Sequence, residues 1–416
     1  MLVGLSLGTG SPQEYLSEIS VDHPAIRYFD SAADNPVDRF SKQLESGKVR
    51  LDLRSGELGY LPSLLHQFDI NVDTQALVFS KTSFQAPKIS PTNPRAIYFN
   101  DDVAVAYVRG SDEIEIAATD AKQGVAFYTA SLKSLPKSGF NRQEICLKCH
   151  QGPATSGVPG IFIGSVFPGP LGTPARGESA IITDHRTAFE DRWGGWYINA
   201  KRGQPKDRSN RVASNPADPE VLDEFEGNQN LTNLFGRFKP EGYLATQSDI
   251  IALMTFEHQT QMTNYLTRVG WEARISAHAE KSGGRPIPQL ESDIEALVAY
   301  MLFADEVVLK DPIEGVSTFT KTFPQRGPRD RRGRSLRDFD LRTRLFRYPL
   351  SYLIYSPAFD ALPDAVREQI YQRLYDVLSG KDKREKFARL SPSDRRAILE
   401  IVRETKPTVP AYWKPN

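Results

Sequence analysis

The stretch RAIYFNDDVAVAYVRGSDEIEIAATDAKQGVAFYTA, from Arg95 to Ala130, decides the fold class. It contains short runs of β-branched and aromatic residues, separated by turn signals such as Asn-Asp and Gly-Ser. Runs of this kind are typical of strands that pair through tight turns. Together with ALVFS, from Ala76 to Ser80, they predict an antiparallel meander or sandwich-like sheet in the N-terminal half.

The segments on either side of these runs have the periodicity of helices. Before them, Val37, Phe40 and Leu44 recur at helical spacing after a candidate cap, Asp34 or Asn35. After residue 248, helical patterns follow one another, and we expect helices over 248–274, 291–305, 365–380 and 392–406. The sequence therefore predicts an α+β fold with a mainly helical C-terminal half.

Three segments are expected along the chain. Residues 1–135 hold the N-terminal helix and the sheet. Residues 136–312 hold long loops rich in glycine and proline, together with the 248–274 helix. Because long ordered loops often cover a bound group, we expect this segment to bind a cofactor, which the motif described below identifies. Residues 313–416 hold a basic linker and the closing helices.

The composition excludes some functions. Lys plus Arg and Asp plus Glu both number 52, so the formal net charge is zero and no overall field favours nucleic acid. No run reaches the ~18 apolar residues of a membrane-spanning helix. Only two cysteines occur in 416 residues, too few for a disulfide framework.

Both cysteines lie in one pentapeptide, Cys146-Leu-Lys-Cys149-His150. A redox disulfide would need a strand that feeds a helix within a βαβ unit, and no such pattern surrounds the pentapeptide. Zinc would need two further ligands, and there is no second cysteine pair and no His-x(3–5)-His pair after it. The C-x-x-C-H spacing instead fits covalent haem attachment, in which the cysteines form thioethers and the histidine ligates the iron.

Through Cys146, Cys149 and His150 the chain resembles the c-type cytochromes. The resemblance covers only this motif and its flanks, and the chain is about four times longer than a small electron-transfer cytochrome. It implies one covalent haem c and a periplasmic or extracellular location, because thioethers form outside the bacterial cytoplasm. It also implies a redox partner protein, and a membrane-associated complex is one setting for such a pair.

The second face of the iron has few candidate residues. Met254, His258 and Met262 fall at i, i+4 and i+8 on one face of a helix, where His258 could ligate or line the pocket. His185 with Arg186 is the pairing that peroxide cleavage uses, a base beside a cation. The alternative for each is ordinary: methionines at this spacing usually pack in a core, and the loop of His185 could be solvated. We favour His258, because a helix holds an imidazole more rigidly than a loop.

Trp193 and Trp196 could pack on the porphyrin, although aromatics beside Gly-Gly also stack in core corners. The expected function is electron transfer by a monohaem c-type cytochrome, as a subunit or partner of a periplasmic redox system. One alternative is a haem enzyme with an open distal face, peroxidase- or oxygenase-like, with His185, Arg186 and His258 as catalytic residues. A second alternative is a zinc-binding structural protein.

Overall fold

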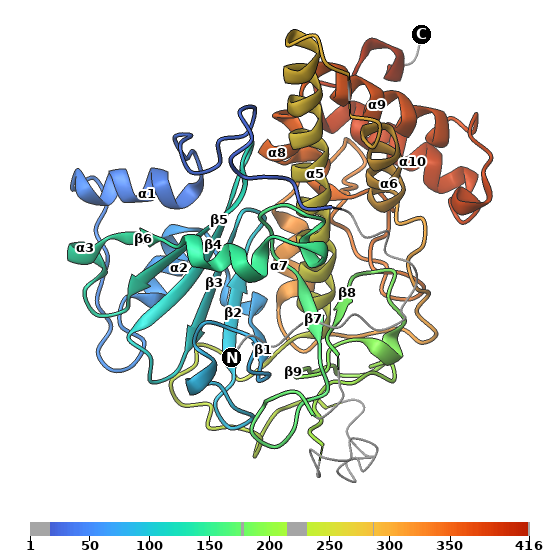
Figure 1. The fold of residues 1–416 in the computed structure, drawn as a ribbon. Helices are drawn as coiled ribbons and strands as arrows, with labels where there is room; N and C mark the ends of the chain where they lie inside the picture. The colour runs from blue at the N-terminus through green and yellow to red at the C-terminus, as the bar shows by residue number, and fades with distance from the viewer. Residues whose placement is uncertain (1–16, 176–178, 214–230, 286, 415–416) are drawn as a thin grey trace.

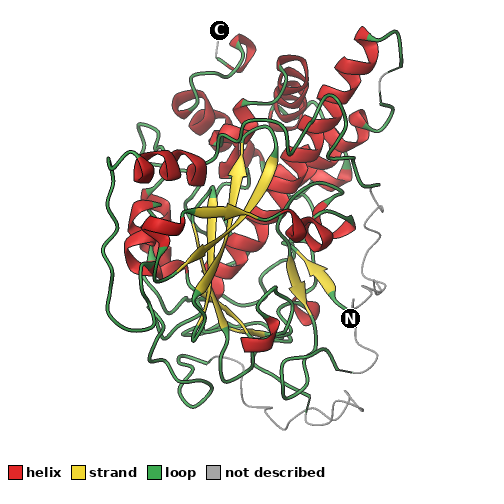
Figure 2. Ribbon diagram, turned by 60° about the vertical axis from the view of Figure 1, so that its left-hand side comes forward, coloured by secondary structure: helices red, strands yellow, loops and turns green. Residues whose placement is uncertain are grey.

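The computed structural model describes residues 17–175, 179–213, 231–285 and 287–414. It confirms the α+β class: an antiparallel sheet fills the N-terminal half, and helices dominate from residue 250 onward (Figure 1). Figure 2 shows helices on both sides of the sheet.

The main sheet has seven strands in the order β6-β5-β4-β3-β2-β1-β9, and every neighbouring pair is antiparallel. Its strands are β1 (Ala76–Val78), β2 (Arg95–Phe99), β3 (Val103–Val108), β4 (Glu113–Asp120), β5 (Gly124–Ser131), β6 (Phe140–Arg142) and β9 (Trp196–Tyr197). The five expected strands are confirmed as a meander, β1 to β5. The sequence analysis missed β6 and β9, and β9 reaches the sheet from far along the chain by pairing Leu77 with Tyr197.

The two faces of the sheet belong to two different cores. On one face, residues such as Tyr98, Val105 and Ile116 pack with α1 (Pro36–Glu45) and α2 (Leu61–Gln67). On the other face, Ile97, Phe99 and Ala104 join the largest core. This alternation follows from the period of two along each strand.

Helix α5 (Ile250–Lys281) is the longest helix and lies against the second face of the sheet (Figure 1). Asp249 caps it by accepting a hydrogen bond from the Ile251 N–H. Phe256 stacks on Phe99 of β2, with ring centroids 4.4 Å apart. Most of α5 is buried because the sheet covers one side and the C-terminal helices cover the other.

The C-terminal helices pack beside α5. They are α6 (Leu290–Met301), α7 (Phe319–Gln325), α8 (Pro357–Asp360), α9 (Asp364–Leu378) and α10 (Pro392–Thr405). Two short helices, α3 (Leu135–Ser138) and α4 (Leu147–His150), flank β6, and a small second sheet pairs β7 (Ile163–Ser165) with β8 (Ile181–Thr183).

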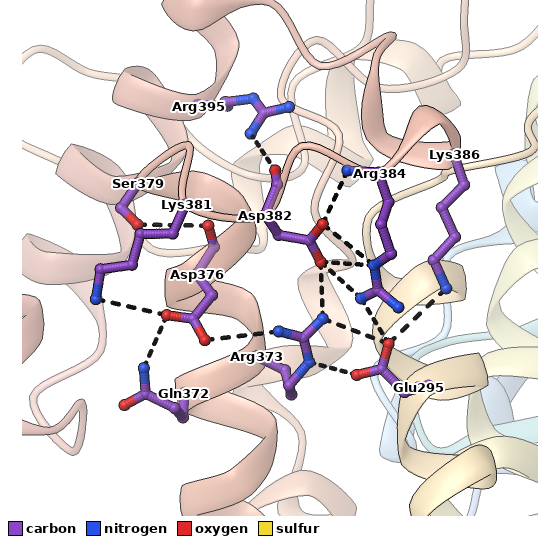
Figure 3. A network of polar contacts seen from close by, with 10 residues as sticks. All are labelled: Glu295, Gln372, Arg373, Asp376, Ser379, Lys381, Asp382, Arg384, Lys386 and Arg395. Carbon is purple, nitrogen blue, oxygen red and sulfur yellow. Dashed lines mark hydrogen bonds and ion pairs between the residues drawn. The ribbon is translucent and has the colours of Figure 1, made fainter.

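Ion pairs join α6 to α9 and to the segment that follows α9 (Figure 3). Arg373 of α9 bonds Asp382 at 2.8 Å and also contacts Glu295 of α6. Arg384 reaches the same Glu295 at 2.7 Å and Asp382 at 2.6 Å. A shared network of this kind fixes the relative position of three chain segments better than isolated surface pairs do.

One hydrophobic core contains residues from all three segments expected from the sequence, from Ala76 of the sheet to Trp413 near the C-terminus. Each segment therefore contributes to a common interior. No helix in the described part of the chain combines the length and the apolar character that crossing a membrane would require.

Candidate functional site

The pentapeptide lies on a tight turn beside the edge of the main sheet. A 3-10 turn (Glu144–Cys146) leads directly into α4. Both cysteines are free thiols; Cys146 is half-buried and Cys149 is exposed. Burial raises the pKa of Cys146 to about 11, with Glu115 and Cys149 adding to the effect. The turn thus presents two unpaired thiols near the surface.

His150 is held in one orientation by its neighbours. Its Nδ1 lies 2.9 Å from the carbonyl oxygen of Gly160. Its ring packs beside Phe127 and Phe162, with centroids 4.7 Å and 5.5 Å away. Burial lowers the pKa of His150 to about 4, so the ring is neutral at pH 7. Because a carbonyl can only accept, Nδ1 carries the proton and Nε2 keeps its lone pair.

Nothing in the described part of the chain hydrogen-bonds to this Nε2 lone pair. Histidines that ligate metals almost always donate their other ring N–H to a carbonyl or carboxylate, which fixes the tautomer. His150 has that arrangement, with the Gly160 carbonyl as acceptor. The residues of the motif therefore fit a haem whose iron is bound through His150 Nε2.

Helix α5 anchors the loop that supplies the Gly160 carbonyl. Asn264 donates to the Ile161 carbonyl at 2.9 Å, and Arg268 donates to the Ser156 carbonyl at 2.9 Å. A Cβ added at Gly160 would lie 2.0 Å from Asn264 Oδ1, so only glycine permits this approach. The position of His150 is thus tied to the most buried helix of the molecule.

A charged pair lies on the sheet beside the motif. Arg95 of β2 and Glu115 of β4 form a partly buried ion pair at 3.0 Å. Both act electrostatically on the ring of His150, and Glu115 also acts on Cys146. Gln143, just before the motif, donates to Thr129 of β5 at 2.9 Å and so joins the turn to the same face.

Exposed apolar side chains occur at and near the motif. Ile145, between the sheet and Cys146 in sequence, is 47% exposed. Phe84 is 64% exposed, and its neighbour Ser83 bonds Glu115 at 3.2 Å. Between strands β3 to β5 and α5, the described residues enclose only a cavity of about 20 Å³, enough for a water molecule.

The structure brings His185 and His258 together, but away from the pentapeptide. Their Nδ1 atoms are 2.9 Å apart, and His258 Nε2 lies 2.8 Å from Ser351 Oγ. His258 is on the side of α5 opposite Phe256 and Gln259, which contact the sheet. Both of its ring nitrogens have protein partners, so this geometry gives no support to iron ligation by His258.

The two histidines form a buried, neutral pair. Burial lowers the pKa of His258 to about 3. The pKa of His185 is lowered mainly by burial and also by the electrostatic effect of His258. Phe303 stacks on both rings, at 4.3 Å from His258 and 4.6 Å from His185. His185 Nε2 is buried without a hydrogen-bond partner among the described residues.

The other residues singled out from the sequence surround this pair. Arg186 forms an ion pair with Asp184 at 2.6 Å. Met254 and Met262 are buried in the largest core. Trp193 donates to Glu257 at 3.1 Å. None of these contacts involves the pentapeptide.

Trp196 is placed differently from Trp193. Its Nε1 donates to the Gly164 carbonyl at 2.8 Å. Gly164 is two residues beyond Phe162, which packs on His150. Trp196 is therefore bonded to β7, the strand that follows Phe162 in the sequence.

Five residues of the site were missed by the sequence analysis: Arg95, Glu115, Phe127, Gly160 and Phe162. Glu115 carried a weak signal, since it is one of two charged residues in the strand pattern EIEIAAT. The other four could not be identified from the sequence, because only tertiary packing brings them next to the motif.

Among the described residues, no group of three or more His, Cys, Asp or Glu side chains converges to hold a metal ion. A zinc site needs such convergence, whereas covalent haem attachment requires thiols that reach a porphyrin edge and one imidazole that reaches its centre. No family model matches the chain, and neither a curated protein nor a solved structure matches it.

Proposed function

We propose that the chain binds one haem covalently through Cys146 and Cys149, with His150 Nε2 as the axial ligand, and that it transfers electrons to or from a redox partner protein. One observation carries the proposal: His150 is a neutral imidazole whose Nδ1–H is directed to the Gly160 carbonyl, beside two free thiols at the attachment spacing. When bound, such a group supplies one-electron oxidation and reduction.

The chain's own residues would hold this group in place. Phe127 and Phe162 fix the plane of the imidazole, and Gly160 fixes its tautomer. Exposed Ile145 and Phe84 offer apolar surface that a porphyrin would remove from water. The nearby Arg95 would be able to pair with an acidic substituent of the porphyrin if its ion pair with Glu115 opened.

The proposed location is periplasmic or extracellular, since thioether attachment takes place there. A second candidate function is a haem enzyme with an open iron face. The contacts of His258 favour this function. His258 was the expected ligand for the second face of the iron, but His185 and Ser351 occupy both of its ring nitrogens, which leaves that face open. The optical spectrum separates the two functions: a low-spin spectrum supports a carrier, and a high-spin ferric spectrum supports an enzyme.

The attachment is tested by producing the chain with a cytochrome c maturation system. The denatured polypeptide should keep the mass of one haem, and the double variant Cys146→Ser/Cys149→Ser should lose it. Lys148→Ser is the matched control, because it changes an exposed residue of the same pentapeptide without removing a thiol. Extraction of the haem from the wild-type chain by acid-acetone, or tight retention by the double variant, would refute covalent attachment. Bound zinc without haem would favour the structural alternative.

A further inference from the structure

A second cavity lies in the C-terminal half, separate from the pentapeptide. It has a volume of about 210 Å³. It opens between the C-terminal end of α6, the segment 343–349 and the segment 386–394 that leads into α10.

Three cationic side chains line this cavity: Arg344, Lys386 and Arg389. Arg389 donates to the backbone carbonyl of Glu306 and forms no ion pair within the described part of the chain. Among the described residues, the one carboxylate paired with Lys386 is Glu295, at 3.9 Å, and that carboxylate is already bound by two arginines (Figure 3). Two of the three charges are therefore weakly compensated.

The two acids of the cavity do not cancel this excess. Asp394 is already bound by Arg344 at 3.0 Å and by Arg347 at 3.5 Å. Glu306 is buried and accepts from the Leu345 N–H at 2.9 Å. Burial raises the pKa of Glu306 to about 7, so its negative charge is incomplete at neutral pH. In addition, the Nε of Arg344 is buried without a hydrogen-bond partner among the described residues.

Apart from Thr343, the uncharged residues of the lining are apolar. Leu302, Phe303, Pro349 and Leu390 contribute to it. Phe303 is also the ring that stacks on His185 and His258, so the cavity shares a wall with the buried histidine pair. Small-molecule sites typically combine such an apolar lining with a few charged groups that fix orientation.

We propose that this cavity binds a small organic anion, a carboxylate carried on a compact apolar body of about the size of benzoate. The carboxylate lies against Arg389 and Lys386, and the apolar body lies against Phe303 and Leu390. The proposal is independent of haem attachment, because none of these residues belongs to the pentapeptide or its surroundings.

Titration calorimetry with benzoate tests this site on the full-length protein, and benzamide is the neutral analogue of the same shape. Benzoate should bind and benzamide should bind much more weakly. Arg389→Gln should weaken benzoate binding roughly tenfold or more, since it removes a charge-assisted hydrogen bond. Arg396→Gln is the matched control, an exposed arginine on the first turns of α10 that does not line the cavity.

Inorganic phosphate is the second probe. Weak binding of phosphate with clear binding of benzoate supports the apolar contact. Equal binding of the two anions would overturn it, leaving a site for charge alone. Absence of benzoate binding at millimolar concentration, or equal affinity in the wild type and in Arg389→Gln, would overturn the proposal as a whole. Thermal unfolding of each variant shows whether a lost signal reflects misfolding.

Discussion

His258 is fully buried and His150 is partly buried, and the two rings differ in their hydrogen bonds. His150 uses Nδ1 to bond a backbone carbonyl, and no described residue bonds its Nε2. His258 uses both nitrogens, one toward His185 and one toward Ser351. A histidine with both nitrogens satisfied inside the protein is structural, whereas one with a fixed tautomer and a free lone pair is prepared for a ligand.

The largest expected effect comes from removing the ion pair near His258, and its counterpart is the ion pair beside the pentapeptide. Glu257, in the buried region, accepts hydrogen bonds from Arg192 at 3.2 Å and Trp193 at 3.1 Å. Glu257→Ala leaves the fully buried Arg192 without its carboxylate, and we expect a loss of ~3–5 kcal/mol in the free energy of unfolding. Urea denaturation at pH 7 measures it.

Glu115→Ala is the matched variant beside the pentapeptide. The side chains of Arg95 and Glu115 are 16% and 20% exposed, so water can partly solvate the arginine left behind. We expect a loss of about 1 kcal/mol. Equal losses in the two variants would contradict the distinction between a buried structural region and an accessible site.

The intermediate effect concerns the glycine that orients His150. Gly160→Ala places a Cβ 2.0 Å from Asn264 Oδ1, and Asn264 is fully buried and bonded to Ile161, so it cannot move away easily. We expect a loss of ~1–3 kcal/mol in the free energy of unfolding, as for other overpacked sites. Haem content should fall as well, because the acceptor of the His150 N–H shifts with the loop.

Gly152→Ala is the control for this variant. Gly152 lies in the same loop, has an extended φ of 165°, and has no atom within 4 Å of an added Cβ. Its stability and haem content should match the wild type. A Gly160→Ala variant that also matched the wild type would show that Gly160 does not position His150.

Local patterns in the sequence predicted much of the fold. The run of β-branched residues between turn signals predicted β4, and the helical pattern over 248–274 predicted α5. Strand β9 could not be found in this way, because Trp196 and Tyr197 form a strand only by pairing with β1 from a distant part of the chain. Local signals fix local structure, while non-local pairing depends on the whole fold.

The candidate site was predictable to a similar extent. The pentapeptide follows from its spacing, since the thiols and the imidazole are neighbours in sequence. The Met254, His258 and Met262 stripe was recognised as a helical face, but the sequence does not say what that face meets. It meets the core around Phe303 and Ser351, and it does not meet the side of the sheet that carries the pentapeptide. Tertiary packing decides such questions.

The last expected effect is the pH dependence that His258 gives to stability. Burial lowers the pKa of His258 from 6.5 to about 3, with Asp184 opposing the shift. Between these values the unfolded chain binds a proton that the folded chain excludes, so stability falls as the pH drops below 6.5. One unit below, at pH 5.5, the contribution of this histidine is about 1.4 kcal/mol.

His258→Gln removes this titration and keeps a polar group beside Ser351. Its free energy of unfolding should therefore fall less steeply than that of the wild type between pH 7 and pH 5.5, whatever its stability at pH 7. Between pH 7.5 and pH 8.5 the two slopes should agree, because His258 is neutral in both the folded and the unfolded chain. Urea denaturation across this range measures both slopes. Parallel curves below pH 7 would mean that His258 can take up a proton in the folded protein, and the structural role assigned to it here would fail.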